Sequence, residues 1–268
     1  MSEPLYDRAF LADHLAVTGV EHLRSGTRHD AWRIETGSGS RMLKVFPAER
    51  EIRFLRELAV LHNVRHPNLM ALDRCGRVNT PQGEVLWYTA EFVDGGDVAD
   101  AMAARRWPDD REVAAFGAGI AAALVELHRH GIVHCDVKPS NIALRSGSWR
   151  EPVLLDPGIV RFHGFDTPDR SPVGTTPYMS PEQLRGESAV PASDVFGLGV
   201  VLYRLVSRGR HPFVGNGERI PYPEAVERIR RGPLRTLDHG LGSLVTGMLR
   251  HAPDDRPSPA ELVEFLPA

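Results

Sequence analysis

The chain has 268 residues, which is enough for one large domain or for two lobes around a cleft. It is 42% hydrophobic and 25% charged, as expected of a soluble globular protein, and its net charge of −3 argues against binding to nucleic acids or anionic membranes. The longest apolar run, residues 195–203, is too short to span a bilayer, and two cysteines with no targeting pattern at the N-terminus favour a cytoplasmic enzyme.

The N-terminal part of the chain combines strand patterns with one helix. Residues 5–18 predict a short helix or an extended lead-in, and residues 22–45 predict two strands around a flexible tip at 37–40. Between residues 48 and 64, residues recur at three- and four-residue spacing in a pattern that predicts a helix, namely Ile52, Leu55, Leu58 (or Ala59) and Leu61 or His62. Two more strand patterns lie near 71–78 and 85–90, around a turn at 79–83.

The clearest helix pattern covers residues 108–131. Asp109 and Asp110 are expected to cap its start, and Gly131 is expected to end it. One apolar stripe runs along it and predicts core positions, namely Val113, Phe116, Ile120, Leu124 and Leu127.

The basic residues have an unusual composition. Of the 32 arginines and lysines, only Lys44 and Lys138 are lysines. A compact ammonium fits sites where a planar guanidinium does not, so both lysines are candidates for selection by function.

Residues 134–141, His-Cys-Asp-Val-Lys-Pro-Ser-Asn, follow the long helix and carry suitable groups for phosphoryl transfer. Asp136 can take a hydroxyl proton, Lys138 can neutralise a moving phosphoryl group, and Asn141 can hold Mg²⁺. The stretch resembles the catalytic loop of protein kinases, H-R-D-x-K-P-x-N, and its lysine resembles that of the serine/threonine branch. The Arg-rich composition is similar to that of bacterial Hanks-type kinases.

The resemblance implies the roles of the central residues. Asp136 would position the acceptor hydroxyl, and Lys138 would stabilise charge on the γ-phosphoryl group. Asn141 and Asp156 would be the metal ligands. Asp156 begins Asp-Pro-Gly where most relatives have D-F-G, and Pro157 is expected to make this segment flip less freely.

Lys44 resembles the lysine of the V-A-I-K strand, which grips the α- and β-phosphates. Glu57 lies nine residues before the motif His-Pro-Asn at 66–68, so it is the expected partner of Lys44; Glu51 is the alternative.

A nucleotide site is also implied by the resemblance. Its expected residues are Gly26, Ala31, Met42, Lys44, Glu91, Val93, Asp97, Ala143 and Asp156. Backbone groups of Glu91 and Val93 would pair with adenine, and Asp97 would reach the ribose. Met42 replaces a usual alanine and Ala143 a usual bulky residue, an exchange that either conserves pocket volume or weakens ATP binding.

Two departures from the kinase pattern bear on activity and control. The glycine-rich loop keeps only Gly26, with Arg24 and His29 in place of glycines; it is either degraded, as in a pseudokinase, or compensated by the charge of Arg28 and His29. Cys135 replaces the usual arginine of the catalytic loop, which predicts weak dependence on activation-segment phosphorylation at Thr167, Ser171 or Thr175; the alternative is that Arg161 substitutes for that arginine. A buried apolar thiol is the simpler interpretation of Cys135, and a redox switch is the alternative.

Residues 173–182 resemble the end of a protein-kinase activation segment, G-T-P-x-Y-M-S-P-E. The resemblance implies that Thr175 bonds Asp136 and Lys138 and that Glu182 pairs with Arg256. Residues 193–200 resemble a buried helix of the lower lobe, with Ser193 as its cap and Asp194 bracing the catalytic loop.

The resemblance therefore implies an α+β, two-lobed kinase fold, with a sheet-rich N-lobe over 1–93 and a helical C-lobe over 94–268. The implied activity is ATP- and Mg²⁺-dependent phosphorylation of serine or threonine in a protein substrate, and any regulatory protein would come from another chain. A pseudokinase or nucleotide-gated scaffold is the alternative, and a small-molecule kinase is a third hypothesis.

Overall fold

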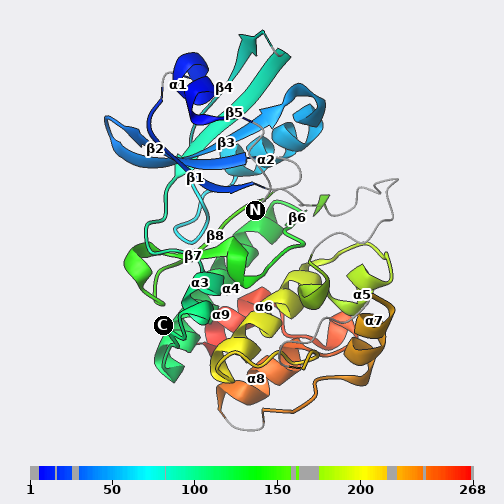
Figure 1. The fold of residues 1–268 in the computed structure, drawn as a ribbon. Coiled ribbons are helices and arrows are strands. Elements are labelled where there is room, and N and C mark those ends of the chain that lie inside the picture. The colour runs from blue at the N-terminus through cyan, green and yellow to red at the C-terminus, as the bar shows by residue number, and fades with distance from the viewer. Residues whose placement is uncertain are drawn as a thin grey trace. The chain divides into compact units, whose positions relative to one another are not determined.

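The structure is a computed structural model that describes residues 6–15, 17–25, 30–81, 83–157, 161–162, 175–215, 222–237 and 240–266. The chain divides into two compact units (Figure 1). The first unit comprises residues 1–65 and 70–92, and the second comprises residues 66–69 and 93–268. No helix in the described ranges is long and apolar enough to cross a membrane.

The first unit is built on a five-stranded antiparallel sheet with the order β1-β2-β3-β5-β4. Its elements are α1 (Arg8–Leu15), β1 (Thr18–Ser25), β2 (Asp30–Thr36), β3 (Gly39–Pro47), η1 (Ala48–Arg50), α2 (Glu51–Asn63), β4 (Leu72–Thr80) and β5 (Gly83–Glu91). The predicted hairpin tip at 37–40 is confirmed, because Thr36 pairs with Gly39 across it. Gly39 has a φ of +102°, a conformation that favours glycine.

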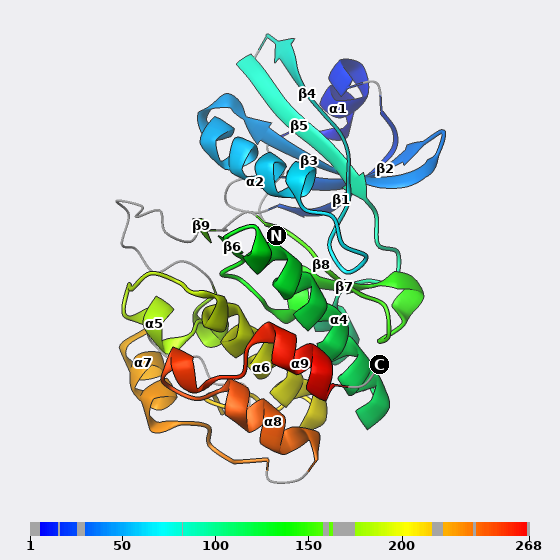
Figure 2. The same cartoon turned by 180° about the vertical axis from the view of Figure 1, so that it is seen from behind.

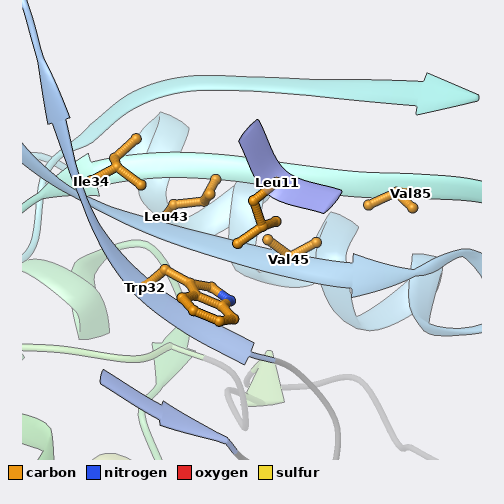
Figure 3. Close-up of a cluster of buried hydrophobic side chains, with 6 residues drawn as sticks. All are labelled: Leu11, Trp32, Ile34, Leu43, Val45 and Val85. Carbon is orange, nitrogen blue, oxygen red and sulfur yellow. The ribbon is translucent and has the colours of Figure 1, made fainter. Parts of the chain in front are cut away.

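The two helices of the first unit cover opposite faces of the sheet. Side chains alternate between faces along a strand, so Leu43 and Val45 of β3 point to one face while Lys44 and Phe46 point to the other. Leu11 of α1 packs on the first face, within a buried cluster of Leu11, Trp32, Ile34, Leu43, Val45 and Val85 (Figure 3). On the second face, Phe46 contacts Phe54 of α2 with ring centroids 5.6 Å apart.

Helix α2 confirms the predicted helix but buries a different face. Ile52 and Leu55, whose spacing indicated the helix, are 71% and 47% exposed. The buried residues are Phe54, Glu57, Val60 and Leu61. The helix turns this face to the sheet because Glu57 there meets the ammonium of Lys44, and a buried carboxylate needs such partners.

The second unit is mainly helical. Its elements are α3 (Val98–Ala103), α4 (Asp110–Arg129), β6 (Ile132–Val133), η2 (Pro139–Asn141), β7 (Ile142–Leu144), η3 (Arg145–Gly147), β8 (Pro152–Leu154), β9 (Arg161–Phe162), η4 (Thr176–Tyr178), α5 (Pro181–Leu184), α6 (Pro191–Val206), α7 (Tyr222–Arg231), α8 (Leu241–Met248), η5 (Pro253–Asp255) and α9 (Pro259–Phe265). Helix α4 contacts both α6 and α9 (Figure 2).

Helix α4 follows the sequence prediction closely. Asp109 is its N-cap and forms a capping box with Glu112, which satisfies exposed amide groups of the first turn. The predicted apolar stripe is fully buried, at Val113, Phe116, Ile120, Leu124 and Leu127. Gly131 follows with a φ of +69° and lets the chain turn into the catalytic loop.

Helix α6 is mostly apolar, and its residues from Ser193 to Tyr203 are buried. The prediction that Ser193 caps it is wrong, because the helix begins at Pro191 and Ser193 already lies in its first turn. The Ser193 hydroxyl instead accepts a hydrogen bond from the Val190 amide and donates one to Glu182. Ser193 thus satisfies the amide of the N-cap residue, Val190, although it is not the N-cap itself.

Candidate active site

Asp194 of α6 fixes the start of the catalytic loop. Its two carboxylate oxygens accept hydrogen bonds from the backbone amides of His134 and Cys135, both at 2.8 Å. The same carboxylate contacts Nε2 of His128, on α4, at 2.8 Å. The brace that the sequence predicted is therefore present, and His128, which the sequence did not single out, adds a link to α4.

Asp136 lies at the centre of a hydrogen-bond network in the second unit. Its Oδ1 accepts from the backbone amide of Thr175 at 3.0 Å and from the Thr175 hydroxyl at 2.9 Å. Its Oδ2 accepts from Nζ of Lys138 at 2.6 Å and from Nδ2 of Asn141 at 3.0 Å. Lys138 also donates to the Thr175 hydroxyl at 2.6 Å. The expected contacts of Thr175 with Asp136 and Lys138 are thus present.

The candidate metal ligands, Asn141 and Asp156, flank the same end of one antiparallel pair, β7 and β8, where Ile142 pairs with Leu154. The amide of Leu155 donates to the carbonyl of Asn141 at 2.8 Å, which places Asn141 beside the residue that precedes Asp156. Asn141 bonds to Asp136 through its amide nitrogen, and these bonds do not use the amide oxygen. A carboxylate and an amide oxygen are the hard donors that Mg²⁺ prefers, so this pair fits the expected ion.

Two residues of this site have left-handed backbones. Cys135 has a φ of +68° and Asp156 a φ of +56°. Such conformations cost about 1–3 kcal/mol at residues other than glycine, and they persist where surrounding bonds impose them. For Cys135 these bonds are visible: its amide donates to Asp194, and its carbonyl accepts from Nε2 of Gln183 at 2.9 Å.

His134 joins the catalytic loop to the Asp156 segment. Its Nε2 donates to the carbonyl of Leu155 at 3.0 Å, and its Nδ1 accepts from the amide of Asp136 at 3.3 Å. A backbone acceptor and a backbone donor therefore fix the orientation of the imidazole. The sequence showed His134 only as a member of the catalytic-loop motif and did not indicate this link to Leu155.

The thiol of Cys135 is buried and contacts the carbonyl of Val133 at 3.4 Å. Burial, with the charge of Asp194 as the next cause, raises its pKa far above the usual range of a cysteine. The thiolate is the reactive form, so the simpler interpretation of a buried structural thiol is favoured over a redox switch.

In the first unit, Lys44 and Glu57 form a buried ion pair, with Nζ and Oε2 at 2.7 Å. They are 3% and 0% exposed. The alternative partner, Glu51, instead bonds to the exposed Arg77 on β4. The prediction that Glu57 contacts Lys44 is therefore confirmed.

The structure groups several candidate nucleotide residues by face and by neighbour. Ala31 is the cross-strand neighbour of Lys44, and Met42 is that of Ala90, so these residues share one face of the sheet. In the second unit, Asp97 and Ala143 form an isolated β-bridge.

The remaining nucleotide candidates lie at the ends of structural elements or outside the described residues. Asp97 uses Oδ1 to cap α3, accepting from the amide of Asp100 at 2.8 Å. Glu91 donates its amide to the carbonyl of Ala71, and Val93 is the first residue of the second unit after the strand. Gly26, with Arg28 and His29, and the activation-segment positions Thr167 and Ser171 lie outside the described residues.

Beyond Thr175, the chain forms η4, which α6 and the segment after it hold in place. Nε2 of His211 donates to the carbonyl of Pro177 at 3.0 Å, and Arg204 of α6 donates to the Tyr178 hydroxyl. Burial, and then the charge of Arg204, lowers the pKa of His211 to about 4. No pattern in the sequence pointed to His211, because its partner is a backbone carbonyl distant in the chain.

The predicted pair of Glu182 and Arg256 is present in a buried, bidentate form. Arg256 donates from NH1 and NH2 to the two carboxylate oxygens at 2.8 and 2.9 Å. Burial alone would raise the pKa of Glu182, but the bonds and charge of Arg256 outweigh it and the pKa is lowered. The pair anchors the segment that contains Thr175 to the end of the chain.

Comparison with known proteins agrees with this geometry. Residues 42–265 match the family described as "Protein kinase domain". The chain is 34% identical over 229 residues to serine/threonine-protein kinase PkaA of Streptomyces coelicolor, covering 82% of this chain and 40% of that protein. It is 32% identical over 215 residues to PknB of Mycolicibacterium smegmatis (76% and 33% covered), and 38% identical over 184 residues to PknJ of Mycobacterium bovis (65% and 30% covered). The chain thus spans 40% or less of the length of these relatives.

Proposed function

We propose that this chain, which belongs to the protein kinase family, transfers the γ-phosphoryl group of ATP to serine and threonine hydroxyls of proteins. The observation that carries the proposal is the network in which both oxygens of Asp136 are held by Lys138, Asn141 and Thr175. A carboxylate held in this way can orient an acceptor hydroxyl, which is its main task in a loose phosphoryl-transfer transition state.

The roles of the other residues follow from their chemistry. Lys138 would neutralise charge on the transferred group, while Thr175 orders Asp136 and Lys138 around it. Asn141 and Asp156 would hold Mg²⁺, which bridges the phosphates and neutralises their charge when it is bound. In the N-lobe, residues 1–93, Lys44 would grip the nucleotide phosphates, with Glu57 as its partner.

The nucleotide would be bound, besides Lys44, by the other residues that the family resemblance assigns to it. Gly26, Ala31, Met42, Glu91 and Val93 belong to the proposed binding set. Asp97, Ala143 and Asp156 complete it from the C-lobe, residues 94–268. The β-bridge between Asp97 and Ala143 supports the joint role of those two residues.

We further propose that control by activation-segment phosphate is weak. Cys135 stands where an arginine would pair with such a phosphate, and its buried thiol cannot form that pair. Any regulatory protein would then act from another chain. Free cysteines at positions 75 and 135 and the use of ATP support a cytoplasmic reaction.

The test compares wild-type protein with Asp136→Asn, using γ-labelled ATP, Mg²⁺ and a generic protein acceptor. The asparagine keeps the size of the side chain but removes its negative charge, so label transfer should fall by about 10²- to 10⁴-fold. Equal transfer by both proteins would refute the mechanism. If wild type transfers no label but its unfolding temperature rises with millimolar Mg-ATP, the chain is a nucleotide-gated scaffold instead.

A further inference from the structure

Glu57 is held by more than the lysine that the family pattern assigns to it. Its carboxylate is fully buried, and its Oε2 accepts from Nζ of Lys44 at 2.7 Å and from the hydroxyl of Tyr88 at 2.8 Å. Its Oε1 accepts from Nε of Arg53 at 2.9 Å. The single carboxylate therefore joins β3, β5 and α2.

Tyr88 reaches Glu57 because of the register of the sheet. It is the direct cross-strand neighbour of Lys44 between β3 and β5, so both side chains leave the same face and meet one carboxylate oxygen. The tyrosine ring is fully buried and lies 5.9 Å from the ring of Phe46. A packed aromatic ring has few accessible rotamers, so its hydroxyl stays at a fixed place above β5.

Arg53 lies one helical turn before Glu57 on α2, at the spacing that brings side chains together. It is half-buried, which makes its ion pair less screened than one at the surface. The cluster contains two cations, Lys44 and Arg53, and one anion, Glu57. The carboxylate therefore does not cancel the full positive charge, and the cluster remains attractive to an anionic group.

These contacts matter most when Lys44 bonds to a phosphate. A carboxylate with lysine as its only partner would then lose part of its compensation, and a buried unpaired charge is costly. With Tyr88 and Arg53 in place, Glu57 keeps a donor on each oxygen. Lys44 can then share its ammonium without releasing α2 from the sheet.

We propose that Tyr88 and Arg53 are positioning residues, which hold Glu57 and α2 in the arrangement that aims Lys44 at a nucleotide phosphate, before any nucleotide binds. The inference rests on the proposed function for its catalytic consequence, but not for its structural one. It also implies that α2 needs no other signal to take this place, in line with the weak phosphate control proposed above.

The structural consequence is tested by hydrogen exchange of the nucleotide-free protein. In Tyr88→Phe the ring volume is kept and only the hydroxyl is lost, so the amides of residues 51–63 should exchange about tenfold faster, while those of α4 keep their rate. Tyr203→Phe is the matched control, because it removes a hydroxyl bond to the carbonyl of Arg235 in the second unit. Unchanged exchange in α2, or equal acceleration in α2 and α4, would overturn the proposal.

The catalytic consequence is tested by steady-state kinetics. In Arg53→Gln, the factor by which kcat falls should be about ten times larger than the factor by which KM for ATP rises. Arg53→Lys keeps a cation and should restore most of the lost kcat. Arg56→Gln is the control, since Arg56 is exposed on the same helix. Equal kinetics of Arg53→Gln and Arg56→Gln would overturn the role of Arg53. If wild type itself transfers no phosphate, the proposed function fails, and the exchange experiment still tests whether Tyr88 holds Glu57 and α2 in place.

Discussion

Thr175 shows how one residue couples the catalytic loop to the segment that follows it in the site. Its amide and hydroxyl both donate to Oδ1 of Asp136, and its hydroxyl also accepts from Lys138. The hydroxyl therefore bridges the ammonium and the carboxylate, which also contact each other directly at 2.6 Å. The residue is half-buried, so its effect is expected on activity more than on stability.

We predict that Thr175→Val lowers kcat by about tenfold, because one charge-assisted hydrogen bond to Asp136 and one to Lys138 are lost. Thr175→Ser keeps the hydroxyl and should retain most of the activity. Steady-state kinetics with a protein acceptor measure both variants. A serine variant as impaired as the valine variant would contradict this prediction, because serine keeps the hydroxyl to which the activity is ascribed.

His211 gives a pH dependence at the residue scale. Its folded pKa of about 4 lies below the ordinary value of 6.5, so the unfolded chain binds the proton more readily between these values. The contribution of His211 to the unfolding free energy is therefore fully present above about pH 6.5. It is lost as the pH falls towards 4, and the loss is at most about 3 kcal/mol.

We predict that His211→Gln flattens this part of the stability profile. Glutamine can still donate to the carbonyl of Pro177, but it does not titrate. Urea unfolding between pH 4 and 8 measures the effect, with wild type and variant compared at each pH. A variant whose stability falls as steeply as that of wild type would contradict the assignment.

At the scale of elements, α1 is a short helix that depends on the sheet for its stability. A helix of eight residues is marginal in isolation, and Leu11 supplies its fully buried contact with the strands. The periodic sequence left open whether residues 5–18 form a helix or an extended segment. The apolar face of the sheet decided it, because Trp32, Ile34, Leu43 and Val45 need a cover (Figure 3).

Leu11→Ala should lower the unfolding free energy of the protein by about 2–5 kcal/mol, since it leaves a cavity over the sheet. Chemical denaturation followed by tryptophan fluorescence measures the loss. Asp13→Ala, an exposed change on the same helix, is the control and should shift the free energy by less than about 0.5 kcal/mol. Similar effects of both changes would show that Leu11 does not anchor α1.

Helix α2 illustrates why the spacing of apolar residues was not enough to orient an element. The period of the helix was clear, but the spacing did not show that Glu57 would lie on the buried face. The chain buries the stripe with Phe54 and Glu57 and leaves Ile52 and Leu55 exposed. Glu57 can lie on the buried face because its carboxylate accepts hydrogen bonds from three side chains there. A pattern of hydrophobicity cannot show such bonds.

At the scale of the whole chain, Glu182 and Arg256 connect segments 74 residues apart. The arginine also donates to the carbonyls of Ala192 and His251, so it ties α5, α6 and the region before α9 together. Because the pKa of Glu182 is lowered, this pair stabilises the fold above about pH 4.5 and ceases to do so as the pH falls further.

Arg256→Met should therefore destabilise the protein by about 3–5 kcal/mol at pH 7, because it leaves the carboxylate buried without its cation. Adding Glu182→Gln to this variant removes the unpaired charge and should recover part of the loss. Denaturant unfolding of the two single variants and the double variant gives the coupling. Additive effects in the cycle would show that the ion pair contributes nothing of its own.

The sequence by itself determined the family, the order of the motifs and the chemistry of the site, because these depend on residue types at fixed local spacing. Asp136, Lys138 and Asn141 lie within one short loop, residues 136–141, so their proximity follows from the local sequence alone. Glu57 as the partner of Lys44, and Glu182 with Arg256, came from the family resemblance, and the contacts are present.

Only the tertiary structure decided which groups support those residues. Tyr88 meets Glu57 through a cross-strand register, Gln183 holds the carbonyl of Cys135, and His211 holds that of Pro177. Each is a contact between segments far apart in the chain, and two of the three use backbone atoms, which leave no mark on residue identity. For His211, burial also lowers the pKa to about 4, because the cost of a buried charge depends on surroundings that only the folded chain supplies.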